Sequence, residues 1–202
     1  ITATTVSLVG NEAKGGDGGA FYFQNEDDVT VENTLVKGNR ASRDGGAFYL
    51  TSSQLRMVNV TVAGNYAGGQ GGAVSIAPAS GSEVVNSIVW QNSAGGGYPQ
   101  IAFRYGSSMT FQNSDLQGSG GSDAWNTGFG DTCNCVTSND GEGNIDQNPF
   151  FDIPVDPSSA PTVGGDLHVQ EGAPTVNSGL NSAVSGLTTD VEGDPRIQPQ
   201  NG

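Results

Sequence analysis

Paired carboxylates are the residues of this chain that could most directly do chemistry. Asp17 and Asp44 each come just before a Gly-Gly pair, and Gln70 holds the same place before a third pair. If these positions stack on one another, two carboxylates approach so closely that they repel unless a cation or water lies between them. Asp17 and Asp44 are therefore candidate calcium ligands, and plain solvent exposure is the simpler alternative.

Aromatic side chains offer a second kind of chemistry, because flat rings bind sugars and protein partners. Tyr22 and Tyr49 occupy equivalent positions, and the alternating apolar residues around them predict that both face outward. Trp125 lies in a later segment rich in glycine. We therefore name Tyr22, Tyr49 and Trp125 as candidate ligand-binding residues. The alternative for the tyrosines is a stacked ladder that only shields the backbone.

No catalytic residue is predicted. A lyase acting on acidic polysaccharides would need calcium ligands beside an Arg or Lys. Among the seven basic residues only Arg40 and Arg43 lie close together, in what reads as a solvated turn. A glycosidase would instead need two carboxyls about 5–9 Å apart. Asp27 and Asp28 are adjacent in sequence, and in a strand they would point to opposite faces.

The single histidine and the two cysteines give weak signals. His168 lies in a short expected strand, where a lone histidine is usually structural. Cys133 and Cys135 are too close in sequence to link distant parts of the fold. We predict a local disulfide first, free thiols second and a metal site last, because one Cys-x-Cys supplies too few ligands for zinc.

Composition limits the partners. The 202 residues include 21 acidic and 7 basic side chains, for a formal net charge of −14. Such a charge repels nucleic acid and anionic membrane surfaces, and no apolar run reaches the roughly 20 residues that span a bilayer. We therefore expect neither nucleic-acid binding nor direct membrane insertion. Acidity with so few lysines is common in secreted and surface proteins.

A repeat with a period of about 26–27 residues positions the candidate residues, and such a period is typical of solenoids. Its clearest mark is the Gly-Gly-Ala copies that begin at Gly18, Gly45 and Gly71. Alternating apolar residues predict an all-β fold with about three short strands per coil, and successive coils should pair in parallel about 4.8 Å apart.

Two columns of asparagine keep the same register. We expect the first to form an amide ladder along a corner and the second to mark a turn with left-handed backbone geometry. The first column is Asn33, Asn59, Asn86 and Asn113, and the second is Asn39, Asn65 and Asn92.

A single domain is expected over residues 1–202, in three parts. Residues 1–117 hold the regular coils and begin in mid-solenoid. Residues 118–143, rich in Gly, Ser, Asn and Asp, show no sustained alternation and predict an inserted loop. Residues 144–202 predict irregular C-terminal coils, and we expect the parent protein to be longer.

Two sets of motifs resemble known families. The Gly-Gly-Ala and Gly-Asn repeats of residues 1–119 resemble the coils of polymorphic outer-membrane proteins and other right-handed parallel β-helices of the pectate-lyase-like superfamily. Gly-Asn-Ile-Asp at 143–146, Asn-Pro-Phe-Phe at 148–151, Asp-Leu-His-Val-Gln at 166–170 and Asp-Pro-Arg at 194–196 resemble the end of choice-of-anchor Q proteins. The resemblance implies a right-handed parallel β-helix that is secreted or displayed on a bacterial surface, and it implies no reaction.

Three functions follow as hypotheses. The leading one is a non-enzymatic extracellular module for adhesion or structural assembly, with a polysaccharide or a host or cell-surface protein as partner. The second is a polysaccharide lyase or glycoside hydrolase whose groups meet across coils. The third is a fibre subunit, because open coils at both ends would leave edge strands free to pair end to end.

Overall fold

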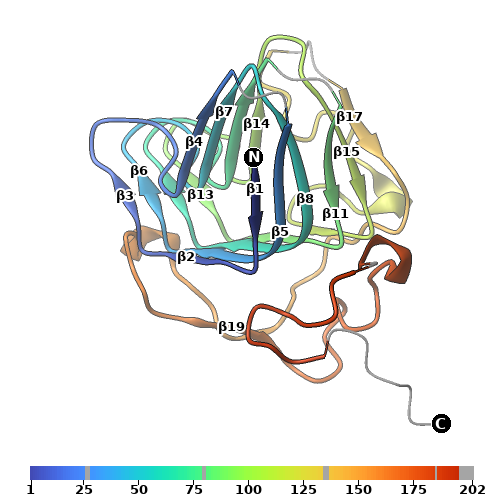
Figure 1. Cartoon of the computed structure of the whole chain (residues 1–202). Helices are drawn as coiled ribbons and strands as arrows, with labels where there is room; N and C mark the ends of the chain where they lie inside the picture. Colours follow the sequence, from blue (N-terminus) through green and yellow to red (C-terminus); the bar gives the residue numbers. More distant parts are fainter. Residues whose placement is uncertain (26–27, 79–80, 134–136, 185, 196–202) are drawn as a thin grey trace, which may run out of the picture.

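The computed structural model describes residues 1–25, 28–78, 81–133, 137–184 and 186–195. The chain winds as a parallel β-solenoid whose coils stack along one axis, and a C-terminal segment lies beneath the stack (Figure 1). None of the helices in this described part is long and apolar enough to cross a membrane.

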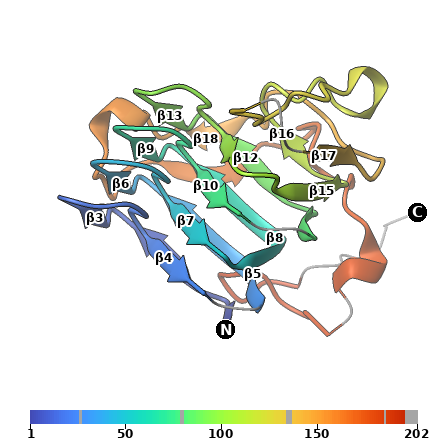
Figure 2. The same cartoon turned by 90° about the horizontal axis from the view of Figure 1, so that it is seen from above.

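One wall of the solenoid is a four-stranded parallel sheet in the order β14-β10-β7-β4. Its strands come from the repeated segment after each Gly-Gly-Ala, and they run side by side in Figure 2. The register places Tyr22 beside Tyr49 and Tyr49 beside Ser75. The bounds are Phe21–Gln24 for β4, Phe48–Thr51 for β7, Val74–Ala77 for β10 and Ile101–Phe103 for β14.

A nine-stranded sheet makes the other two walls, because it bends at the first asparagine column. In the long strands β5 (Asp28–Lys37) and β8 (Gln54–Ala63) the bend lies at Asn33 and Asn59, with φ of 51° and 55°. Asparagine tolerates this left-handed geometry better than most residues. Before the bend β5 pairs with β1 (Thr2–Thr4) and β8 with β11 (Ser82–Val85), and β15 (Ser108–Gln112) and β17 (Thr137–Asp140) follow β11 in the sheet. After it they pair with β2 (Ser7–Val9) and β12 (Ile88–Trp90), and β12 pairs with β16 (Asp115–Leu116).

A short fourth row closes each coil. Two-residue strands stack in the order β13-β9-β6-β3, just after the second asparagine column. Their bounds are Glu12–Ala13 for β3, Arg40–Ala41 for β6, Tyr66–Ala67 for β9 and Ser93–Ala94 for β13. The expected three strands per coil are thus present, with this additional row.

The core is the narrow apolar stripe that the alternation predicted. Val29 and Val31 in β5 and Met109 and Phe111 in β15 point inward and are fully buried, while the residues between them face outward. Phe48 of β7 meets this stripe from the opposite wall. Because each coil stacks its apolar residues on those of the next, a thin core suffices for a chain with few hydrophobic residues.

The amide ladder forms at the second asparagine column and not at the first. Nδ2 of Asn11 donates to Oδ1 of Asn39, Asn39 donates to Asn65, and Asn65 donates to Asn92, each at 2.9 Å. The same oxygens also accept backbone N–H groups from the preceding coil. The prediction that the Asn33 column would be the ladder was therefore wrong. Its asparagines sit in the bend, and the amides of Asn33, Asn86 and Asn113 donate to carbonyls of the C-terminal segment.

Residues 118–143, which we expected to be an inserted loop, include a further irregular stretch of coil. Strand β17 extends the nine-stranded sheet by pairing with β15, and Ile145 bridges to Asp115 of β16. The 3-10 helix η1 (Ser122–Ala124) leads into Trp125. The alternation is lost because this coil covers the end of the core and has no neighbour on its far side within the described chain.

The C-terminal strap, residues 147–195 apart from residue 185, crosses the base of the coil stack (Figure 1). It contains β18 (Phe151–Ile153), the 3-10 helices η2 (Pro157–Ser159) and η3 (Asn181–Val184), and β19 (Asp166–Val169), which pairs antiparallel with β18. Phe151 packs with Ala63 and Trp90 of the solenoid, and Ile88 and Leu167 border this cluster.

Backbone and amide groups of the coils hold the strap. The amide N–H of Thr162 donates to the carbonyl oxygen of Gly38, and a Cβ on Gly38 would clash with the carbonyl oxygen of Thr162. Asn86 both donates to the carbonyl of Leu180 and accepts from its N–H. Asn33 and Asn113 donate to the carbonyls of Thr189 and Ser178. The repeated glycine and asparagine columns thus form the surface on which the strap lies.

Candidate functional site

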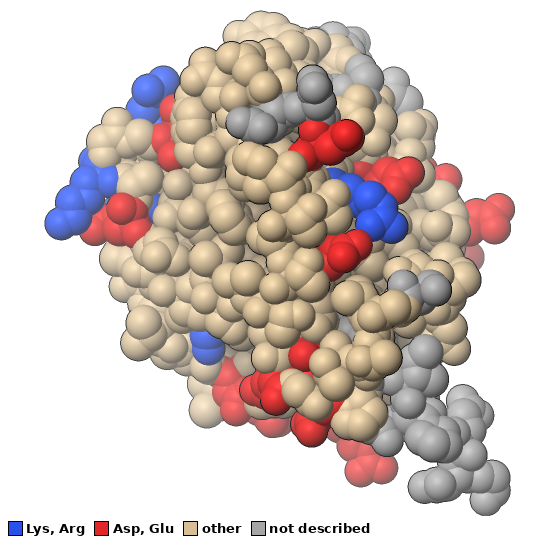
Figure 3. All heavy atoms as spheres, viewed as in Figure 1, with Lys and Arg blue, Asp and Glu red and all other residues tan. Residues whose placement is uncertain are grey.

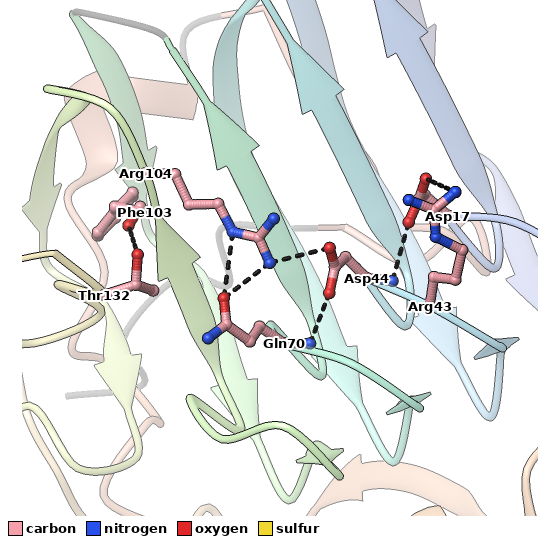
Figure 4. A network of polar contacts seen from close by, with 7 residues as sticks. All are labelled: Asp17, Arg43, Asp44, Gln70, Phe103, Arg104 and Thr132. Carbon is pink, nitrogen blue, oxygen red and sulfur yellow. Dashed lines mark hydrogen bonds and ion pairs between the residues drawn. The ribbon is translucent and has the colours of Figure 1, made fainter.

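The two predicted aspartates cap the backbone of successive coils. Oδ1 of Asp17 accepts the N–H of Asp44 at 3.0 Å, and Oδ1 of Asp44 accepts the N–H of Gln70 at 2.7 Å (Figure 4). These residues lie in the turns before β4, β7 and β10, where a glycine in the left-handed region follows each one. The predicted stacking of Asp17, Asp44 and Gln70 is therefore present, and it places one oxygen of each carboxylate on a backbone donor.

Arginine side chains occupy the second oxygens. Nη2 of Arg104 lies 2.9 Å from Oδ2 of Asp44, and Nη1 of Arg43 lies 3.6 Å from Oδ2 of Asp17. Charge repulsion between the stacked carboxylates is thus relieved by guanidinium groups. Calcium at Asp17 and Asp44 stays a prediction. Across the described ranges no three His, Cys, Asp or Glu residues gather in a way that could hold a metal ion.

Arg104 links three coils across the outer face of the β4–β7–β10–β14 sheet. It follows β14, and its side chain runs back to the start of β10, where Nε and Nη2 donate to Oε1 of Gln70 at 3.1 and 2.7 Å (Figure 4). Sequence reasoning missed this role, because among the seven basic residues it singled out only Arg40 and Arg43. The only available signal was that Arg104 occupies the column of Gln24, Thr51 and Ala77, in which it alone is charged.

Tyr22 and Tyr49 are stacked as predicted. Their ring centroids are 5.3 Å apart with an interplanar angle of 17°, and Tyr22, on the edge strand, is 51% exposed. Burial, and next the nearby Asp17 carboxylate, raise the pKa of Tyr49 above its ordinary value. Its hydroxyl therefore stays neutral and able to donate a hydrogen bond at physiological pH.

An open hollow lies at the other end of the same face. It is lined by Gln70, Arg104, Tyr105, Thr132 and Cys133. Tyr105 is 75% exposed and has φ of 54°, a left-handed geometry that is uncommon for an aromatic residue. Within the described part of the chain no hydrogen bond uses Nη1 of Arg104 or Nε2 of Gln70. The hollow thus combines an exposed ring with two planar groups that can still donate.

Trp125 lies away from this face, at the end of the core. Its ring packs against Phe111 and Phe129 at centroid distances of 5.6 and 6.1 Å, and its Nε1 donates to the carbonyl of Ser138. The ring is half-buried and its polar atom has a partner. Trp125 therefore covers the last coil, and its ligand-binding role stays a prediction.

Cysteine and histidine both take structural positions. Cys133 is disulfide-bonded, and Cys135, its predicted partner, lies outside the described residues. His168 in β19 is exposed between two carboxylates, with Nδ1 2.5 Å from Asp166 and Nε2 2.7 Å from Glu192. Hydrogen bonds to Glu192 and then Asp166 raise the pKa of His168 to about 9, so the ring is charged at neutral pH.

Comparison with protein-family models matches residues 1–116 to the right handed beta helix region, over more than half of the 202 residues. This chain belongs to the right-handed β-helix family. The match ends at Leu116, the last residue of β16, so the family covers the regular coils and leaves out Trp125 and the strap. Comparison with curated proteins and with solved structures gives no significant match.

Charged side chains are distributed unevenly over the surface of this β-helix. In the view of Figure 3 acidic side chains gather along the lower edge, where the strap runs, and basic side chains are few. On the tyrosine face Asp17 and Asp44 are each matched by an arginine. That face is therefore close to electrically neutral, although the chain as a whole carries −14. Such a surface favours hydrogen bonding and ring stacking over attraction of highly charged ligands.

Proposed function

We propose that this β-helix is a non-enzymatic extracellular or cell-surface module that adheres to a polysaccharide or a surface glycoprotein. The binding surface is the outer face of the β4–β7–β10–β14 sheet. The observation that carries the proposal is the Tyr22–Tyr49 stack, in which Tyr22 is exposed and Tyr49 partly buried, on the same face as the hollow beside Tyr105. Aromatic rings accompanied by a few planar polar groups are the usual chemistry of sugar recognition sites.

The state of the carboxylates favours binding over catalysis. A general acid or base needs a carboxyl whose oxygens can reach the substrate. On this face Asp17 and Asp44 have one oxygen on a backbone N–H and the other on an arginine, which suits a structural role. The bacterial origin and the surface location rest on the resemblance to polymorphic outer-membrane and choice-of-anchor Q proteins, and they belong to the proposal.

A panel of polysaccharides and glycoproteins, measured by isothermal calorimetry with and without calcium, tests this function. We expect the double variant Tyr22→Ala, Tyr49→Ala to bind about tenfold more weakly, because ring contacts contribute roughly 0.5–1.5 kcal/mol each. Phe150→Ala is the matched control, since Phe150 is similarly exposed (48%) but lies on the strap.

Two outcomes would overturn the proposal. One is binding that the tyrosine substitutions leave unchanged. The other is turnover, seen as new reducing ends or unsaturated products, which would support the lyase or hydrolase hypothesis instead. Light scattering on the same samples checks end-to-end assembly, for which the ring cluster around Trp125 is an obstacle because it covers one end of the coil stack.

A further inference from the structure

The first residue of the strap is hydrogen-bonded to a buried carboxyl group. Asp115 in β16 is only 2% exposed, and its Oδ1 accepts the N–H of Gln147, the first residue of the strap, at 3.2 Å. Its neighbour in register, Ile88, borders the apolar cluster that Phe151 of the strap makes with Trp90. Asp115 is therefore enclosed where the strap begins to cover the solenoid.

This carboxyl lacks the partners that a buried charge needs. Within the described chain its Oδ2 is buried and has no hydrogen-bond partner. The charged group facing it is another acid, Asp146, whose Oδ2 is fixed by the N–H groups of Gly118 and Gly120. Burial of an unpaired carboxylate beside a like charge is strongly unfavourable, so the enclosed state favours the protonated acid.

A second proton joins two parts of the strap to each other. The His168 ring bridges Asp166 on its own strand and Glu192 in the turn near residue 195. Lys37 of the solenoid is the other charge nearby; its Nζ donates to the carbonyl of Gly165 and its charge acts on Asp166. The side chains of the bridge are well exposed, at 58% for His168, 43% for Asp166 and 55% for Glu192. The exposed His168 bridge is therefore expected to contribute less free energy than the buried Asp115 carboxyl.

We propose that the strap is an acid-held clamp, docked on the coils while Asp115 is protonated and released from them as Asp115 loses its proton, with the His168 bridge inside the strap lost in the same direction. Asp115 lies on the coils, whereas His168 and both of its partners lie within the strap. Deprotonation disfavours docking directly at Asp115 and loosens the strap itself at His168. At Asp115 it creates an unpaired buried charge. At His168 it removes the positive charge that joins two carboxylates.

The pH window follows from the direction of each shift. Burial raises the pKa of Asp115 to about 7 from an ordinary value near 3.8. Its contribution to docking is fully present below pH 3.8 and is lost as pH rises toward 7, by up to about tenfold in the docking equilibrium for each pH unit. The pKa of His168 is raised to about 9 from 6.5, so its contribution to the folded strap is present below 6.5 and lost as pH rises through 9.

Trp90 provides a direct probe, because it lies in the cluster beneath the strap. In a Trp125→Phe background it is the only tryptophan of the chain. We expect acrylamide quenching of its fluorescence to increase between pH 5 and 10 in two steps, the larger below pH 7 and the smaller near 9. Asp115→Asn should remove the lower step and Glu192→Gln the upper one. Asp152→Asn, an exposed acid on β18, should leave both in place.

Amide exchange in the unmodified protein gives an independent readout. The N–H groups of Thr162 and Leu180 bond to Gly38 and Asn86 only while the strap is docked. Their protection, corrected for intrinsic exchange, should decline with rising pH while that of the β8 amides is retained. Quenching and protection that stay flat from pH 5 to 10, or an Asp115→Asn profile identical to that of the parent, would overturn the proposal.

Discussion

Arg104 Nη2 lies 2.9 Å from Asp44 Oδ2, although the two residues are 60 positions apart in the chain. The contact joins the coil that contains β14 to the coil that contains β7, and Gln70 of the intervening coil accepts from the same guanidinium. One side chain therefore fixes the spacing of three coils on the face where we place ligand binding.

Replacing Arg104 by Met should lower the free energy of unfolding by about 1–3 kcal/mol, because Asp44 would keep a mostly buried carboxylate oxygen without its cation. Urea denaturation measures the change. Arg56→Met is the matched control: Arg56 also joins three coils, its own and those of Glu32 and Glu83, but its side chain is 43% exposed. We expect that control to cost less than about 1 kcal/mol. Equal losses would show that Arg104 is an ordinary surface pair.

Asn65→Ala should be among the most damaging single substitutions. It would leave the buried backbone N–H of Asn39 without its acceptor and would remove the amide that donates to the carbonyls of Val36 and Ala63. Each buried polar group left unpaired costs roughly 1–3 kcal/mol, so we expect a loss of at least about 3 kcal/mol in thermal or urea unfolding. Asn11→Ala, at the exposed end of the ladder, should lose much less. Similar losses at both positions would contradict a ladder that matters for stability.

Replacing either Asn59 or Asn86 by glycine distinguishes the effect of backbone geometry in the bend from the effect of the hydrogen bonds to the strap. Asn59 and Asn86 have φ of 55° and 51°, so a change to Gly suits both backbones. Asn86 makes two bonds to Leu180, whereas the buried Nδ2 of Asn59 has no partner in the described chain. Asn86→Gly should therefore cost about 1–3 kcal/mol more than Asn59→Gly. Calorimetry of the two variants measures this difference in stability. Equal losses would mean that the hydrogen bonds between Asn86 and Leu180 do not stabilise the fold.

A methyl group on Gly38 should push the strap away from the coils. Gly38 has φ of +62°, and its new Cβ would meet the Thr162 carbonyl. Gly106→Ala carries the same kind of backbone penalty at φ +74° with nothing within 4 Å of the new Cβ. We expect Gly38→Ala to increase proteolysis within the strap and Gly106→Ala to leave it unchanged. Equal digestion of the two variants would argue against close strap contact.

The repeat period alone predicted the coils correctly, because each coil of the solenoid repeats the same pattern of inward-facing and outward-facing residues. The inward columns, the parallel pairing and the Tyr22–Tyr49 stack each depend on residues one period apart. The ladder was assigned to the wrong asparagine column, since spacing does not reveal whether an amide points along the axis or away from it.

The contacts that could not be predicted from the sequence join parts of the chain that share no repeat period. Arg104 reaches Asp44 over 60 positions, and Asn86 meets Leu180 over 94. The strap has no repeat of its own, and its position depends on glycine and asparagine columns that already had an explanation as turn residues. The raised pKa of Asp115 was equally hidden, because the segment whose N–H bonds to this carboxyl begins 32 positions later, at Gln147.

The strap also has a fixed length, and this has a consequence for how the protein could change in size. Between its bond to Asp115 and its bond to Gly38 the strap runs only from Gln147 to Thr162, and this stretch must pass the intervening coils. A duplicated coil would satisfy the asparagine ladder on both sides and would bring another left-handed glycine, equivalent to Gly38 and Gly64, to the height at which Thr162 now bonds. The strap thus limits the number of coils that it covers, while the solenoid itself can lengthen.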